Sequence, residues 1–165
     1  MPDKHYIFDT VSLANFLLTD TASMVTRRYG GRASITMQVL DELTSGMRTH
    51  IRLKQVELLL AQNHFALISL TPSEYTFYTG LIINLGKGEA SCIAAASVRD
   101  AVVVTDDRAA RNRCVESGIA CTGTIGILKA ACIDKQISAL DADRVLHAMI
   151  ENGFFSPVGR ISDVL

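Results

Sequence analysis

The stretch Ala101-Val102-Val103-Val104-Thr105-Asp106-Asp107 carries the clearest fold signal in the sequence. Its apolar residues form the continuous, β-branched run that is typical of a strand buried on both faces of a parallel sheet. The acids that follow mark the point where the strand emerges into a loop. Functional groups of open parallel sheets gather beyond the carboxyl ends of the strands, so Asp106 and Asp107 are candidate site residues.

A second predicted strand ends in an acid in the same way. Tyr6-Ile7-Phe8 is a short apolar run that stops at Asp9, and residues 10–18 then carry apolar side chains at helical spacing. Two strands are therefore expected to deliver carboxylates to one edge of the sheet. Asp9, Asp106 and Asp107 could equally serve as helix N-caps, and the two roles are compatible.

Strand and helix patterns alternate along the rest of the chain. Further strands are expected at 33–35, 65–70 and 119–122, and helices at 39–47, 51–61, 72–85, 89–98, 108–117, 124–135 and after Ser138. The polar stretch 19–32, with its adjacent glycines, is predicted to be a helix end and a loop. This alternation indicates βαβ units and an α/β fold with a parallel sheet. We expect a single domain over residues 1–165, with a core at about 6–135 and a C-terminal helix and tail at 138–165.

The composition excludes several classes of protein. A formal net charge of −1 gives no global attraction to nucleic acid or to anionic membranes, so any polyanion must be held locally. A hydrophobic content of 48% is too high for a disordered chain. No apolar run approaches the roughly 18 residues of a membrane span. The four cysteines lack C-x-x-C spacing and the N-terminus is polar, which indicates a reducing cytoplasm.

Two glutamates are weaker candidates than the aspartates. Glu42 lies on an amphipathic helix, where a solvated face is the ordinary role, and the neighbouring Asp41 could replace it in any site. Glu89 begins a helix of small residues, so it could simply complement the helix dipole. Grouped carboxylates nevertheless favour Mg²⁺ or Mn²⁺, which prefer hard oxygen ligands and can activate water at a phosphodiester. Because crowded carboxylates repel one another, an acid cluster predicts a cation.

Four stretches resemble the PIN-domain family in their order and spacing: Phe8-Asp9-Thr10 with Asn15-Phe16-Leu17, Val39-Leu40-Asp41-Glu42-Leu43, Gly88-Glu89-Ala90-Ser91, and Val103-Val104-Thr105-Asp106-Asp107-Arg108. The segment 123–128, Gly-Thr-Ile-Gly-Ile-Leu, also looks like one branch of this family. The resemblance implies a three-layer α/β/α domain with a central parallel sheet of about four to five strands. It further implies a metal-dependent nuclease acting on RNA, frequently a homodimer, and in VapC-type relatives the toxin partner of an antitoxin.

Carried over to this sequence, the resemblance implies that Asp9, Glu42, Glu89 and Asp107 hold Mg²⁺ or Mn²⁺. Asp106 stands beside the last of these acids and is an alternative to it. Ser91 occupies a position where some relatives carry another acid, which is a departure from the family pattern.

Four further residues are candidates for contact with the substrate. The hydroxyls of Thr10 and Thr105 could position water or a ligand, although local capping explains them equally well. Arg108 and Arg111 lie one helical turn apart beside the acids and could bind phosphates, with a solvated face or pairing with Glu116 as the alternative.

Three functional hypotheses follow from these residues. The leading one is metal-dependent hydrolysis of RNA phosphodiester bonds. The second is a catalytically inactive PIN-fold module that binds RNA or a protein partner. The third is a phosphatase of another α/β fold, and Val11 counts against it because such enzymes carry a second aspartate at this position.

Overall fold

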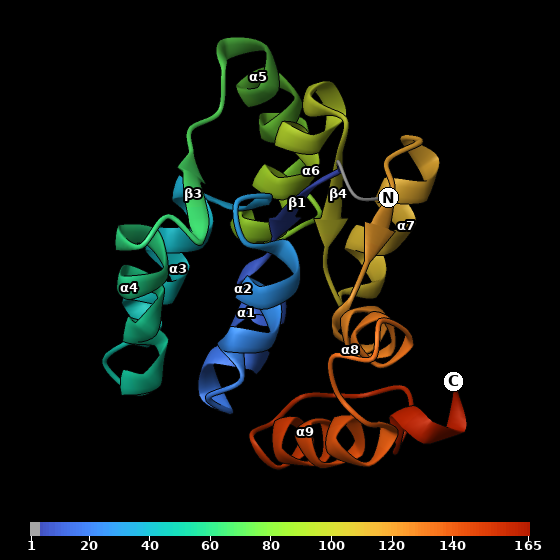
Figure 1. Cartoon of the computed structure of the whole chain (residues 1–165). Coiled ribbons are helices and arrows are strands. Elements are labelled where there is room, and N and C mark those ends of the chain that lie inside the picture. Colours follow the sequence, from blue (N-terminus) through green and yellow to red (C-terminus); the bar gives the residue numbers. More distant parts are fainter. Residues whose placement is uncertain (1–3) are drawn as a thin grey trace.

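The structure, a computed structural model, describes residues 4–165 and contains one parallel sheet (Figure 1). Its strands are β1 (His5–Phe8), β2 (Ala33–Thr36), β3 (Phe65–Ile68), β4 (Ala101–Val104) and β5 (Cys121–Thr122). They lie in the order β3-β2-β1-β4-β5, and every pairing is parallel. The predicted α/β class with a parallel central sheet is therefore confirmed.

The pairing of β1 with β4 determines where a site can form. His5 to Phe8 lie in register with Ala101 to Val104, and the backbone N–H of Asp9 extends the ladder by donating to the carbonyl of Val104 over 2.9 Å. From β1 the chain adds β2 and β3 on one side. It then crosses back and places β4 and β5 on the other side of β1. Beyond the carboxyl ends of β1 and β4 lies the topological switch point, where ligands bind in open α/β sheets.

Helices cover both faces of this sheet and give the expected three-layer arrangement. The helices on one face are α1 (Thr10–Leu18), α2 (Ala22–Tyr29), α3 (Met37–Gly46), the 3₁₀ turn η1 (Ile51–Lys54) and α4 (Gln55–Ala61). The helices on the other face are α5 (Pro72–Leu81), α6 (Lys87–Arg99) and α7 (Arg108–Glu116). Right-handed crossovers place the helices before β3 and those after it on opposite faces.

Helix α6 packs closely against the middle of the sheet, where it contacts β1, β2 and β4. Its small side chains make this approach possible, and Ala90, Ala94 and Ala95 have no exposed surface. The sequence predicted such close packing from the alanine-rich composition of this helix. The first turn of α6, which carries Glu89, is thereby held against the carboxyl edge of the sheet.

The prediction for residues 19–32 was wrong, because α2 occupies most of this stretch. Ala22, Val25 and Tyr29 form a buried face at helical spacing, while the intervening residues, apart from Met24, are polar. That polar majority and the adjacent glycines concealed the narrow apolar stripe. Arg28 and Arg32 stack on the ring of Tyr29 at the amino end of β2, away from the acids.

The C-terminal segment packs back onto the domain. Helices α8 (Thr124–Ile133) and α9 (Ala139–Glu151) contact each other, and α9 also contacts α1. Figure 1 shows α9 and the tail in red at the opposite end of the molecule from α5. The 3₁₀ turn η2 (Ile161–Asp163) lies on α9, where the backbone N–H and hydroxyl of Ser162 donate to Asp143. Ile161 is fully buried in the same core cluster.

No helix within residues 4–165 has both the length and the apolar composition needed to span a membrane. The four cysteines are free thiols, of which Cys92 and Cys114 are buried.

A buried glutamate fixes the start of α5. Glu74 is only 1% exposed, accepts the backbone N–H of Thr71 over 2.7 Å in a capping box, and pairs with Arg99 of α6 over 2.7 Å. The hydrogen bonds from Arg99 are the main reason why the pKa of Glu74 is lowered from 4.5 to about 2. The stabilisation from this carboxylate is therefore complete above about pH 4.5 and is lost as the pH falls through 2.

Replacing Glu74 by alanine is expected to reduce the free energy of unfolding by about 2 kcal/mol, because the capping box is broken and Arg99 loses its carboxylate. Unfolding in urea at pH 7 measures this loss. Glu57 is an exposed helical glutamate, so Glu57→Ala is the matched control and should change stability by less than about 0.5 kcal/mol. Equal losses in the two variants would contradict the role given to Glu74.

Candidate functional site

Asp9 lies at the carboxyl end of β1 and is almost completely buried, with 1% of its surface exposed. Its Oδ1 accepts the backbone N–H of Ser12 over 2.8 Å, so it also caps α1. Burial raises the pKa of Asp9 to about 7, against the lowering effect of hydrogen bonds from Thr105 and Ser12, and the charge of Asp106 adds to the rise. The predicted cap role of Asp9 is confirmed, and its carboxylate lies at the carboxyl end of β1.

Glu42 projects from α3 toward the first turn of α6. The hydroxyl of Thr10 donates to its Oε1 over 2.6 Å, which joins the start of α1 to α3. A Cβ atom at Gly88 would collide with the same oxygen, so glycine at this position leaves room for the glutamate. Both Asp41 and Glu42 are exposed, but it is Glu42 that makes these contacts and lies at the carboxyl edge.

Glu89 lines a small cleft together with Glu42, and the charge of Asp107 also acts on it. Its Oε2 accepts the backbone N–H of Gly86 over 3.2 Å. Partial burial raises the pKa of Glu89, and the charge of Asp107, followed by that of Glu42, raises it further. The cleft holds about 90 Å³, and its walls are formed by Thr10, Val11, Glu42, Gly86, Gly88 and Glu89. Repulsion among these carboxylates indicates an edge that would be stabilised by positive charge.

Asp106 and Asp107 have different surroundings. Asp106 accepts the backbone N–H of Thr124 over 2.8 Å on Oδ1, and on Oδ2 it accepts hydrogen bonds from Thr124, Ser12 and Asn15. It therefore ties β4 to α1 and to the first turn of α8. The N-cap of α8 is Gly123, which has no side chain to accept a hydrogen bond, and Asp106 supplies the acceptor from another segment.

Asp107 is exposed and has fewer protein partners. Its Oδ2 accepts the backbone N–H of Ala110 over 2.8 Å as the N-cap of α7. Its own backbone N–H donates to the hydroxyl of Thr105, which is buried. Both oxygens of Asp106 are engaged by the protein, whereas Asp107 is exposed and accepts one hydrogen bond through Oδ2, so the geometry favours Asp107 over Asp106 as the outward-facing acid.

The two candidate arginines also differ. Arg111 donates to the backbone carbonyl of Thr105 over 3.1 Å and so supports the loop that carries the acids. Arg108, the first residue of α7, is exposed beside Asp107. Glu116 pairs with Arg113 rather than with either candidate.

A buried hydroxyl pair at this edge was not foreseen from the sequence. Thr36 at the end of β2 and Ser91 on α6 are fully buried, and their side-chain oxygens lie 2.7 Å apart. Ser91 also donates to the backbone carbonyl of Gly88, and Thr36 caps α3 through the backbone N–H of Val39. The pair thus connects the helix that carries Glu42 with the turn that carries Glu89. The only feature of the sequence that pointed to this pair was Ser91, which stands where some relatives carry an acid.

The residues present fit a divalent cation by their chemistry. Asp9, Glu42, Glu89 and Asp107 offer carboxylate oxygens, which suit Mg²⁺ or Mn²⁺, and burial of Asp9 makes a cation favourable there. Within residues 4–165, however, no three acidic, histidine or cysteine side chains converge closely enough to ligate one ion. Glu42 and Asp107 are the most exposed of the four acids.

Comparison with known proteins agrees with this architecture. A family model described as a PIN domain matches residues 5–165, and the chain belongs to the PIN-domain family. The comparison with curated proteins gives no match. Among solved structures, the chain is similar to one in the crystal structure of VapBC2 from Rickettsia felis bound to a DNA fragment from its promoter, with a TM-score of 0.52 and 12% identity over 72% of this chain and 97% of that one. At this identity, the likeness shows a shared fold.

Asp9→Asn is expected to stabilise the protein at pH 8 in EDTA. The pKa of Asp9 is about 7 in the folded state against an ordinary value of 3.8, so the native state binds the extra proton and stability falls as the pH rises between these values. The variant removes this penalty of up to about 4 kcal/mol. Thermal unfolding at pH 5 and pH 8 measures the difference, which should be larger at pH 8.

The matched control for this experiment is Asp41→Asn at an exposed position. Its stability should follow that of the wild type at both pH values. Adding Mn²⁺ should raise the melting temperature of the wild type and of Asp41→Asn more than that of Asp9→Asn. A wild type that is more stable than Asp9→Asn at pH 8 in EDTA would contradict the raised pKa.

Asp106→Asn should lower the stability of the protein, whereas Asp107→Asn should lower its affinity for Mn²⁺. An asparagine at 106 loses acceptor capacity toward Thr124, Ser12 and Asn15, and should cost about 2–3 kcal/mol of stability. An asparagine at 107 can still cap α7, so the fold should be retained while affinity for Mn²⁺ falls. Thermal unfolding and Mn²⁺ titration of both variants test this. The reverse pattern would identify Asp106 as the ligand.

Proposed function

We propose that this protein is a metal-dependent ribonuclease. The observation that carries the proposal is the buried Asp9 at the switch point of a PIN-family sheet, with Glu42, Glu89 and Asp107 along the same edge. Membership of the PIN-domain family supports a nuclease. We call the edge formed by Asp9, Glu42, Glu89 and Asp107 the acid edge. RNA as the substrate, the divalent metal and the residue roles are inferences from this acid edge and from the family resemblance.

Asp9, Glu42, Glu89 and Asp107 are the residues that would hold Mg²⁺ or Mn²⁺. When bound, such an ion supplies Lewis-acid chemistry: it lowers the pKa of water and stabilises negative charge on a leaving oxygen. Hydrolysis forms a bond between a water oxygen and phosphorus and breaks one ester bond, and the leaving oxygen is protonated. The phosphodiester must reach the edge without long-range attraction, since the net charge is −1.

The chain itself contributes positioning. Thr10 orients Glu42 through the 2.6 Å hydrogen bond, and Thr105 orients the backbone of Asp107. Arg108 is exposed at the start of α7 and is placed to pair with a substrate phosphate. Arg111 acts on the substrate only indirectly, because its guanidinium binds the carbonyl of Thr105.

The cellular role in this proposal is that of a toxin silenced by an antitoxin protein, acting in the cytoplasm as a homodimer. The similarity in fold to a chain of the VapBC2 structure supports this role, together with the resemblance of the motifs. A small neighbouring gene that encodes a DNA-binding protein would support it further.

Ser91 favours a second candidate function, a catalytically inactive module of the same fold that binds RNA or a protein partner. Ser91 occupies the place of a family acid and is fully buried against Thr36. It therefore offers no ligand to a metal. Metal-stimulated turnover separates the two candidates.

Glu42→Gln should reduce cleavage of labelled RNA in Mn²⁺ by at least about 100-fold, because it removes a charged ligand oxygen. Asp41→Asn changes the adjacent, exposed acid and should cleave at the wild-type rate. EDTA and Asp9→Asn should each abolish cleavage while the protein stays folded. Cleavage that persists in EDTA, or equal losses for Glu42→Gln and Asp41→Asn, would refute the proposal.

A further inference from the structure

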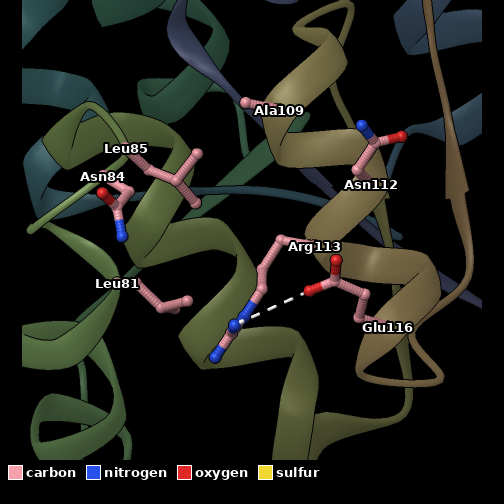
Figure 2. A pocket seen from close by; sticks show the side chains of 7 residues that line it. All are labelled: Leu81, Asn84, Leu85, Ala109, Asn112, Arg113 and Glu116. Atoms are coloured by element: carbon pink, nitrogen blue, oxygen red, sulfur yellow. Dashed lines mark ion pairs between the residues drawn. The ribbon is translucent and has the colours of Figure 1, made fainter.

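A separate pocket lies between α7 and the turn that joins α5 to α6 (Figure 2). It holds about 280 Å³, which is just below the roughly 300–1,000 Å³ of small-molecule sites, so it can take one flat group rather than a long chain. Leu81 and Leu85 contribute apolar surface from the α5 side. Asn84 also lines it from this side, Asn112 and Arg113 line it from α7, and none of these residues belongs to the acid edge.

The pocket is nearly neutral. Arg113 pairs with Glu116 over 3.7 Å, and its guanidinium lies 5.9 Å from the ring centre of Phe77. Figure 2 shows this ion pair within the pocket. Because Glu116 offsets the charge of Arg113, the pocket offers little to a bare phosphate. Its remaining polar groups are the carboxamides of Asn84 and Asn112, each with donors and an acceptor in one plane.

Carboxamides beside leucines match a nucleobase. Base faces bind apolar side chains, and asparagine forms a paired hydrogen bond with the N6 and N7 atoms of adenine. Unpaired RNA bases are recognised through such edge contacts. Glu116 adds an acceptor that could receive an exocyclic amino group.

The pocket adjoins the acid edge on two sides. Leu85 lines the pocket, and the next residue, Gly86, lines the cleft of Glu42 and Glu89. On the other side, Asp107 caps the helix that carries Asn112. A rise of 1.5 Å per residue puts Asn112 about 7.5 Å along α7 from Asp107, roughly two steps of a stacked strand at 3.4 Å per nucleotide.

From this juxtaposition we propose that the pocket formed by Leu81, Asn84, Leu85 and Asn112 binds one unpaired base of the substrate strand, preferentially adenine, within about two nucleotides of the cleaved bond. The inference rests on the proposed nuclease function. It adds that base binding in this pocket determines where the strand is cut. Arg113 and Glu116 also line the pocket, and their ion pair keeps its charge near neutral.

Cleavage of a randomised RNA pool in Mn²⁺, followed by sequencing of the product ends, tests the proposal. The wild type should prefer adenine at one position near the cut. Asn84→Ala and Asn112→Ala should each reduce that preference by about 5- to 150-fold and leave cleavage of pools without adenine nearly unchanged. Both side chains are exposed, so the variants should fold.

Val115→Ala is the control, since Val115 is 74% exposed on the same helix and does not line the pocket. Its base preference should equal that of the wild type. Unchanged preference in both asparagine variants would overturn the proposal. An unchanged preference accompanied by a changed oligomeric state would instead assign the pocket to protein–protein contact.

A binding experiment keeps the pocket testable if the wild type cuts no RNA, a result that would refute the proposed function alone. The side-chain amide NMR signals of Asn84 and Asn112 are followed during titration with adenosine monophosphate and, separately, with ribose 5-phosphate. Shifts with the nucleotide alone support the base pocket. No shift, or equal shifts with both compounds, overturns it.

Discussion

The parallel pairing of β1 with β4 is the contact on which the rest of this molecule depends. It brings Asp9 beside Thr105 and the following acids, although about a hundred residues of chain separate them. Every other member of the acid edge is placed relative to this pair. Glu42 arrives on α3 after β2, and Glu89 arrives on α6, whose small side chains let it approach β1 and β4. A helix with larger side chains would hold Glu89 farther from the edge.

This arrangement brings several like charges to one edge, and the structure counters the resulting repulsion with hydrogen-bond donors. Asp106 is satisfied by α1 and α8, while Glu42 has the hydroxyl of Thr10. Asp9 and Glu89 are not fully compensated: burial is the main cause that raises the pKa of each, and neighbouring carboxylates add to the rise. The hydrogen-bond donors therefore stabilise the site only in part, and the carboxylates still lack a positive charge beside them. A divalent cation is the simplest group that would supply this charge at a phosphodiester.

Much of this could be predicted from the sequence, because strand burial and helix periodicity are local signals. The run before Asp106 and the apolar residues before Asp9 indicated the parallel sheet and its acid edge. Roles that depend on tertiary contacts were not accessible. Whether Asp106 or Asp107 faces outward depends on Thr124, a contact between distant segments. The Thr36–Ser91 pair likewise joins residues whose neighbourhood only the folded chain reveals.

Binding of a divalent cation at the switch point should displace the proton of Asp9, which the buffer then takes up. Calorimetric titration of Mn²⁺ at pH 6, repeated in buffers of different ionisation enthalpy, counts the protons released on binding. With a pKa of about 7 for Asp9, the wild type should release about one proton per ion more than Asp9→Asn does. Equal release from the two proteins, or binding without release from the wild type, would contradict the account.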